Sequence, residues 1–120
     1  MATMRYLVAD VGDAVSFYVD VLGFEEVERF PAIAIVRSGD LELWLAGPIS
    51  SAARPMPDGR TPEPGGWNRF VIRVDDLEAR VAALASSGVV FRNEIVVGPG
   101  GRQILAEDPS GNVVELFEPA

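Results

Sequence analysis

The hydrophobic and polar residues of this chain alternate in two separate stretches that share one pattern. Residues 3–9 read Thr-Met-Arg-Tyr-Leu-Val-Ala and precede Asp10, and residues 69–75 read Arg-Phe-Val-Ile-Arg-Val-Asp and precede Asp76. The two copies are offset by 66 residues in a chain of 120. Alternation of this kind predicts a half-buried strand. A repeat of about half the chain length predicts a duplicated domain.

Each copy leads into a predicted helix. Asp10 and Asp76 are suited to cap a helix, because a carboxylate accepts hydrogen bonds from the free amides of the first turn. Gly23 and Gly88 are suited to end the two helices in the left-handed conformation. Between cap and glycine, apolar residues recur at helical spacing: Val11, Val15, Tyr18, Val19 and Leu22 in the first helix, and Leu77, Val81 and Leu84 in the second.

Three strands are predicted after each helix. They lie at 24–29, 31–37 and 40–46 in the first half, and at about 89–97, 102–107 and 112–118 in the second. The pattern therefore predicts an α+β fold: two βαβββ modules in tandem, with a mixed sheet and the helices on its outer face. Residues 1–120 are expected to form a single domain.

The boundary between the halves is a segment rich in proline and glycine. The first half spans about 3–46 and the second about 67–118, so residues 47–66 form the connector. Such a segment is not expected to contain regular structure. A long loop in a compact domain is often a lid or an interface segment, and a plain linker is the alternative.

The strand faces that turn away from the helices carry an unusual set of side chains. If the two sheets curl toward each other, this set lines a concave cavity. A cavity with aromatic walls and a few placed charges is a candidate ligand site. The set consists of Arg5, Glu42, Trp44, Arg69, Arg73, Glu115 and Phe117.

The composition removes several kinds of chemistry. The chain has no Cys and no His, and all ten basic residues are Arg. Disulfides, thiolate nucleophiles, Schiff-base lysines and histidine bases are therefore excluded. The net charge of −8 and the lack of clustered cations argue against nucleic acid as a partner. No apolar run approaches the roughly 20 residues of a membrane span, and no signal-peptide pattern is present, so a cytoplasmic protein without a membrane partner is expected.

Three motifs, taken in order, resemble those of a known superfamily. Val8-Ala9-Asp10 precedes the first helix, Phe17-Tyr18 and Leu22-Gly23-Phe24 mark its end, and Asp108-Pro109-Ser110-Gly111-Asn112-Val113-Val114-Glu115-Leu116 lies near the C-terminus. This combination resembles the vicinal-oxygen-chelate superfamily, which includes glyoxalase I, the bleomycin-resistance proteins and extradiol dioxygenases. The resemblance implies paired βαβββ modules whose sheets form a cup, and commonly a homodimer.

The resemblance also implies four metal-ligand positions, typically histidine on the first strand of each half and glutamate on the last. The histidine positions correspond to Thr3 and Arg69, seven residues before Asp10 and Asp76. Glu115 matches the second-half glutamate. Strand alternation favours Glu42 as the first-half glutamate, whereas counting back from the preceding glycines selects Leu43.

A guanidinium donates hydrogen bonds and stays protonated, so it cannot ligate a metal. We therefore expect no metal and no cofactor. In place of a metal centre, an ion-pair cluster is predicted in which Arg69 offsets the repulsion between Glu42 and Glu115.

Three functions are compatible with these residues. The preferred one is a metal-independent protein of the bleomycin-resistance type, which sequesters an aromatic or planar small molecule between Trp44, Phe117 and the two glutamates. The second is a glyoxalase-like lyase, isomerase or dioxygenase, in which Glu42 and Glu115 bind a divalent metal or act as general base. The third is a non-catalytic dimeric module.

Overall fold

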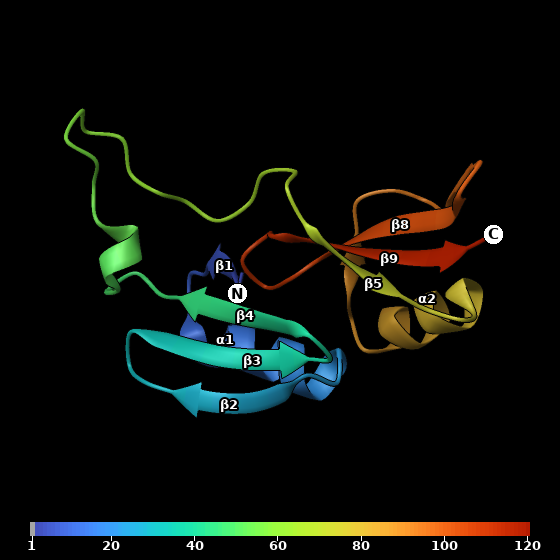
Figure 1. The fold of residues 1–120 in the computed structure, drawn as a ribbon, viewed down its shortest axis with the longest axis horizontal. Coiled ribbons are helices and arrows are strands. Elements are labelled where there is room, and N and C mark those ends of the chain that lie inside the picture. Colours follow the sequence, from blue (N-terminus) through green and yellow to red (C-terminus); the bar gives the residue numbers. More distant parts are fainter. Residues whose placement is uncertain (1) are drawn as a thin grey trace. The chain divides into compact units, whose positions relative to one another are not determined.

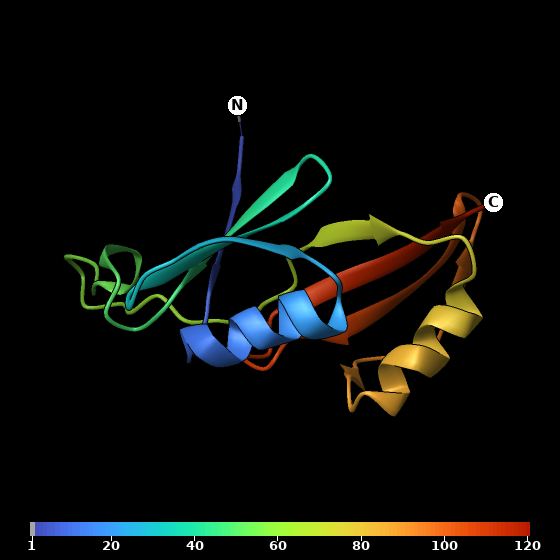
Figure 2. The ribbon, with the colours of Figure 1, turned by 90° about the horizontal axis from the view of Figure 1, so that it is seen from below.

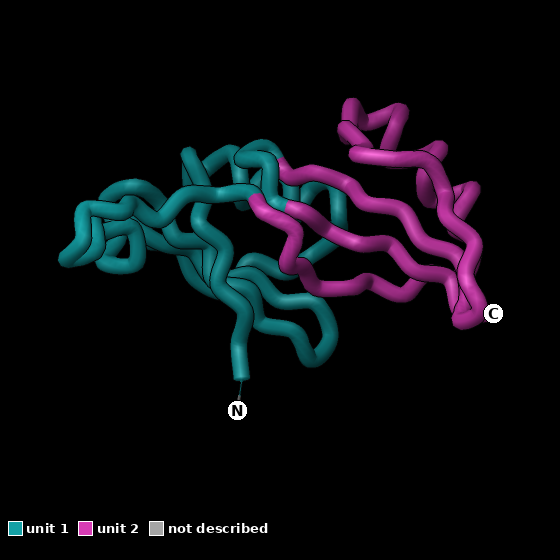
Figure 3. The backbone as a smooth tube through the Cα atoms, turned by 90° about the horizontal axis from the view of Figure 1, so that it is seen from above, with its two compact units in different colours: residues 1–65, 109–112 teal, residues 66–108, 113–120 magenta. Residues whose placement is uncertain are grey.

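The computed structural model describes residues 2–120, which form two compact units (Figure 3). The first unit comprises the chain up to Gly65 together with Pro109–Asn112. The second comprises Gly66–Asp108 and Val113–Ala120. Each unit contains one of the two predicted βαβββ modules, so the predicted α+β class is confirmed.

The first unit is a four-stranded mixed sheet with a helix along one face (Figures 1 and 2). Its strand order is β1-β4-β3-β2, with β1 parallel to β4 and the other pairs antiparallel. The alternation in β4 works as predicted, because Leu43 and Leu45 are fully buried. The elements are β1 (Met4–Leu7), α1 (Val11–Ser16), β2 (Glu25–Arg29), β3 (Ile33–Ser38) and β4 (Leu41–Ala46).

The first helix differs from the prediction of one regular α-helix. Asp10 caps it as expected, accepting a hydrogen bond of 2.8 Å from the amide of Asp13. After α1, however, Phe17–Val21 forms a π-helix, in which each amide bonds one residue further back than in an α-helix. The wider turn rotates the apolar stripe. Phe17 is therefore buried together with Tyr18, whereas Val19 is only half-buried.

The second unit repeats the arrangement around a sheet of order β5-β9-β8-β6, with β5 parallel to β9. β7 pairs with the same strand, β8, as β6 does. Helix α2 lies against one face of this sheet, and Leu77 and Leu84 are its buried residues (Figure 1). The elements are β5 (Phe70–Arg73), α2 (Leu77–Ser86), β6 (Val90–Phe91), β7 (Val96–Gly98), β8 (Gly101–Glu107) and β9 (Val113–Pro119).

The single strand predicted at 89–97 is wrong, because the chain bends between β6 and β7. At the bend, the side chain of Asn93 accepts a hydrogen bond of 3.0 Å from the amide of Leu105. A side-chain oxygen thus replaces a backbone carbonyl in the ladder. Hydrophobic alternation does not reveal such a replacement.

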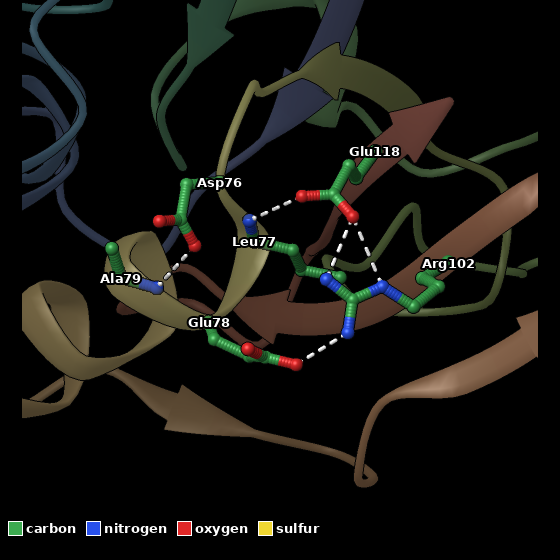
Figure 4. Close-up of polar contacts among 6 residues, drawn as sticks. All are labelled: Asp76, Leu77, Glu78, Ala79, Arg102 and Glu118. Atoms are coloured by element: carbon green, nitrogen blue, oxygen red, sulfur yellow. Dashed lines mark hydrogen bonds and ion pairs between the residues drawn. The ribbon is translucent and has the colours of Figure 1, made fainter. Parts of the chain in front are cut away.

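Two carboxylates hold the N-terminus of α2 (Figure 4). Asp76 accepts from the amide of Ala79 at 3.1 Å, and Glu118 of β9 accepts from the amide of Leu77 at 3.0 Å. A negative charge is favourable there, because the free amides and the helix dipole make that end positive. The helix is therefore tied to the last strand of its own module.

Arg102 of β8 extends this network. Its Nε and Nη2 donate to Glu118 Oε1 at 3.0 and 2.7 Å, and its Nη1 donates to Glu78 in the first turn of α2 (Figure 4). The hydrogen bonds from Arg102 and from the Leu77 amide lower the pKa of Glu118 from its ordinary value. Glu118 is therefore ionised at neutral pH.

The turn at Pro109–Asn112 fastens the first unit. Ser110 Oγ accepts a hydrogen bond from the amide of Ala9 at 2.8 Å. Asn112 is buried, donates from Nδ2 to the carbonyl of Leu7 at 2.7 Å, and accepts at Oδ1 from the amide of Gly65 at 2.8 Å. The turn thereby joins the end of β1 to the end of the connector.

No helix among residues 2–120 is long and apolar enough to span a membrane.

Replacement of Asn112 by alanine is expected to destabilise the protein by about 2 kcal/mol or more, because it leaves two backbone groups without these partners. Urea unfolding followed by circular dichroism measures the change. The matched control is Asn68→Ala, at an exposed asparagine, with an expected change below about 0.5 kcal/mol. Equal effects of the two substitutions would contradict the fastening role of Asn112.

The lowered pKa of Glu118 predicts a dependence of stability on pH. Because the folded-state pKa lies below the ordinary value of 4.5, the contribution of Glu118 is complete above that value and is lost as the pH falls through the folded-state pKa. Glu118→Gln should therefore be less stable at neutral pH and lose less stability on acidification. Unfolding curves between about pH 7 and about pH 3 test this. Glu63→Gln, at an exposed connector residue, should behave like the unchanged protein.

Candidate functional site

The face of the first sheet that lies opposite the buried leucines carries a chain of polar contacts. Arg5 of β1 stands beside Trp44 of β4 in the ladder, and its guanidinium carbon lies 5.1 Å from the centroid of the Trp44 ring. The Trp44 indole donates from Nε1 to Glu42 Oε1 at 2.9 Å. Arg37 of β3 donates from Nη2 to Glu42 Oε2 at 3.1 Å. Both oxygens of Glu42 are thus engaged within its own sheet.

These contacts determine the protonation state of Glu42. The hydrogen bond from Trp44 and the hydrogen bond and charge of Arg37 lower the pKa of Glu42 from its ordinary value. A carboxylate with a lowered pKa is a weak base at neutral pH. The geometry therefore does not favour Glu42 as a general base.

Further along the same face, the sheet borders an apolar cavity of about 200 Å³. Leu7 and Ala46 are paired in the ladder and lie two residues beyond Arg5 and Trp44, so they share the face of that pair. The cavity is lined by Leu7, Val8, Ala9, Ala46, Gly47, Pro48, Ala53, Thr61, Pro62 and Pro64.

The connector supplies one wall of this cavity. It contains a short 3₁₀ helix (Ser51–Ala53), and the buried hydroxyl of Ser50 donates to the carbonyl of Gly47 at 2.6 Å. Ala53, Thr61 and Pro62 then face the cavity. The connector is therefore part of the candidate site of the first unit.

In the second unit, Arg69 is paired with Glu115. Arg69 Nε and Nη2 lie 2.9 and 2.8 Å from Glu115 Oε1, and its Nη1 donates to the carbonyl of Trp67 at 3.2 Å. The Glu115 carboxylate is buried. One pair of the predicted ion-pair cluster is therefore present, whereas Glu42 has Arg37 and Trp44 as its partners.

The ladders correct the assignment of Glu42 as the first-half counterpart of Glu115. The repeat offset makes Arg5 equivalent to Val71. Val71 pairs with Glu115 in the β5–β9 ladder, and Arg5 pairs with Trp44 in the β1–β4 ladder. Trp44 therefore stands where the second half has its glutamate. Alternation identified the correct face of the strand, but it selected Glu42, which lies two residues before the counterpart Trp44.

The residues at the four positions do not fit a divalent metal. Thr3 is neutral and exposed, Trp44 has no ligating atom, and the Glu115 carboxylate is bonded to the cation Arg69. Within residues 2–120, no group of three or more Asp, Glu, His or Cys side chains is placed to hold a metal ion.

Two further predicted site residues lie next to each other in the second sheet. Arg73 of β5 pairs with Phe117 of β9 in the parallel ladder. Arg73 is exposed and Phe117 is half-buried. Because Phe117 lies two residues beyond Glu115, both side chains share one face of the sheet.

Sequence reasoning missed two arginines near the candidate residues. Arg37 is one residue from the β3–β4 hairpin turn, so the turn could have identified it as the cross-strand partner of Glu42. Arg92 lies in the bend after β6, where no periodicity points to it. Its guanidinium carbon lies 4.5 Å from the centroid of the exposed Trp67 ring, and its Nε lies 3.6 Å from Glu107.

Trp67, Arg92 and Glu107 border a second, shallow depression. It has a volume of about 580 Å³ and lies entirely within the second unit, where its lining comprises Gly66, Trp67, Phe91, Arg92 and Glu107. Trp67 therefore contacts Arg92 at this depression.

Solved structures with the same fold include proteins of different activity. The antibiotic-binding protein TnmS3 from Streptomyces sp. CB03234 is 27% identical, with a TM-score of 0.70 and coverage of 100% of this chain and 97% of that one. The bleomycin-binding protein from Streptomyces verticillus, solved with copper(II)-bleomycin, is 27% identical, with a TM-score of 0.66 and coverage of 99% and 95%.

A lactoylglutathione lyase from Agrobacterium tumefaciens shares the fold at 24% identity, with a TM-score of 0.73 and coverage of 98% of this chain and 92% of that one. No curated protein matches the sequence significantly. Residues 1–116 match the family described as the Glyoxalase/Bleomycin resistance protein/Dioxygenase superfamily. Together with the two βαβββ modules, this match shows that the chain belongs to the glyoxalase/bleomycin resistance protein/dioxygenase superfamily.

Proposed function

We propose that this protein is a metal-independent small-molecule-binding protein of the bleomycin-resistance type, which sequesters a planar or aromatic ligand against Trp44. The observation that carries the proposal is the place of Trp44. The half-exposed indole stands in the ladder where the second half has a carboxylate. An aromatic ring at that position offers a stacking surface in place of a metal ligand.

The polar contacts of Trp44 support a stacking role. The hydrogen bond from its indole to Glu42 fixes the ring plane, and Arg37 fixes Glu42 in turn. A ring held in one orientation loses little conformational entropy when a ligand stacks on it. The face is thus pre-organised for a planar group.

The Arg69–Glu115 pair supports metal independence. A metal at Glu115 would have to compete with a guanidinium that makes two contacts with one oxygen of that carboxylate. Removing one partner of a buried ion pair is costly, since it leaves an uncompensated charge. The two relatives named as antibiotic- and bleomycin-binding proteins support the ligand class.

The enzyme alternative has weaker support. Glu42 has a lowered pKa, Glu115 is bonded to Arg69, and the likeness to the lyase concerns the fold. The homodimer that the resemblance implies and the cytoplasmic location predicted from the sequence stay predictions. Exposed valines of the second unit are compatible with a subunit contact; they include Val71, Val90, Val96 and Val97.

Binding of a planar ligand at Trp44 is expected to quench the fluorescence of that residue. The chain has two tryptophans, so Trp67→Phe leaves Trp44 as the sole indole. A thermal-shift screen with planar aromatic antibiotics, and with bleomycin with and without copper(II), identifies a binder. Trp44→Ala should then raise the Kd by about tenfold or more.

The matched control for this experiment is Trp67→Ala, which should leave the Kd of the same compound within about twofold. Quenching that depends on Trp67 and not on Trp44 would place the ligand in the depression of the second unit and contradict the proposal.

Metal independence has its own test. Addition of Ni²⁺, Zn²⁺, Mn²⁺ or Fe²⁺ should not raise the melting temperature in a saturable way. A metal that did bind would be detected, because a ligand at 100 times its Kd stabilises the fold by about 2.7 kcal/mol. Treatment with EDTA should not lower it. Elemental analysis that finds one tightly held metal per chain would overturn the proposal and favour the lyase, isomerase or dioxygenase alternative.

A further inference from the structure

The face around Trp44 has a cation on one side and an apolar cavity on the other. Arg5 stacks on the ring. Leu7 and Ala46, the next pair along the same face, begin the wall of the 200 Å³ cavity. These two neighbours restrict the chemistry of a ligand that stacks on Trp44, so the inference rests on the proposed function.

Arg5 carries an uncompensated charge. The nearest carboxylate on this face is Glu42, and both of its oxygens are bonded to Trp44 and Arg37. No carboxylate within residues 2–120 forms an ion pair with Arg5. Glu25 and Glu28 of β2 share this face, because they pair with Arg37 and Ile35, but β2 is the edge strand opposite β1. The positive charge of Arg5 is therefore local to the β1 edge of a chain whose net charge is −8.

The contact between Arg5 and Trp44 is suited to exchange. At an exposed site a cation–π contact is weaker than a hydrogen bond between two charged groups. A planar ligand that takes the place of the guanidinium on the Trp44 ring therefore binds more tightly if it also carries an acidic group that pairs with Arg5. The guanidinium then donates two parallel hydrogen bonds to that group.

The Arg92–Trp67 pair of the second unit shows the contrast. There a guanidinium also stacks on an indole, but Glu107 lies 3.6 Å from Arg92 Nε, and Arg92 Nη1 donates to the carbonyl of Gly66 at 2.7 Å. The charge of Arg92 is compensated. An acidic group of a ligand is therefore expected to bind more weakly at Arg92 than at Arg5.

The cavity determines a second property. A step of two residues along a strand is about 7 Å, so the cavity begins about one such step from Trp44. Its lining is apolar except for the hydroxyl of Thr61 and backbone groups. An apolar cavity of roughly 150 Å³ is large enough for benzene, so this cavity has room for a short alkyl chain or a small ring.

We infer that the ligand of the Trp44 site is a planar aromatic acid that carries a short apolar substituent. Its ring stacks on Trp44, its acidic group pairs with Arg5, and its substituent enters the cavity between β1, β4 and the connector. Neutral planar compounds of the same shape bind more weakly.

The acidic group is tested with naphthalene-2-sulfonate and its neutral counterpart naphthalene-2-sulfonamide, by isothermal titration calorimetry on the full chain. The sulfonate should bind roughly five-fold more tightly, and less so at high salt. In Arg5→Ala the difference between the two probes should disappear. The control Arg29→Ala removes the same charge from β2, where Arg29 pairs with Glu26 at 2.7 Å, and should keep the difference.

The apolar substituent is tested with 6-propylnaphthalene-2-sulfonate. It should bind about tenfold more tightly than naphthalene-2-sulfonate, because the propyl group leaves water. Ala53→Phe fills the cavity from the connector side and should abolish this gain without weakening the binding of the unsubstituted probe. Ala52→Phe, one residue earlier and outside the cavity lining, should keep the gain.

The outcomes separate the two proposals. Binding that needs Trp44 but is equally tight for the sulfonate and the sulfonamide overturns the acid inference and leaves the proposed function intact. Absence of any gain from the propyl group in the unchanged protein overturns the role of the cavity. If none of the three probes shows binding that Trp44→Ala weakens, the inference is wrong. The proposed function is overturned only if the planar antibiotics also show no binding that depends on Trp44.

Discussion

Parallel pairing of the first and last strand of each module is the constraint on which the rest of this structure depends. β1 pairs with β4 and β5 pairs with β9, and every other strand pair is antiparallel. A parallel pair requires a crossover connection, which here includes a helix that covers one face of the sheet. The opposite face is left for other side chains. The register of the parallel pair then decides which of them become neighbours.

That register gives the two halves different chemistry from equivalent positions. In the first half it sets Arg5 against Trp44, and in the second it sets Val71 against Glu115. Glu115 lies in the middle of its sheet and is buried, so its charge needs a partner, which Arg69 provides. Trp44 needs no countercharge and remains half-exposed. The duplication therefore supplies one scaffold with an ion pair in one unit and an aromatic surface in the other.

The turn at Pro109–Asn112 has a structural role in this chain. Asn112 bonds to Leu7 and to Gly65, and Ser110 bonds to Ala9, so a segment between β8 and β9 belongs to the first unit. These contacts hold the end of β1 and the end of the connector, and both border the apolar cavity. A motif that identifies the superfamily thus also shapes a wall of the candidate site.

The sequence by itself determined the two modules, the helix caps at Asp10 and Asp76, and the buried faces of the strands, because each depends on local periodicity or on a side chain bonding to a nearby amide. It also predicted the Arg69–Glu115 pair. Only the tertiary structure decided that the partners of Glu42 are Arg37 and Trp44, and that Trp44 is the counterpart of Glu115. Strand register and the bend at Asn93 depend on contacts between residues distant in sequence, and hydrophobic alternation repeats every two residues, so it cannot distinguish position 42 from position 44.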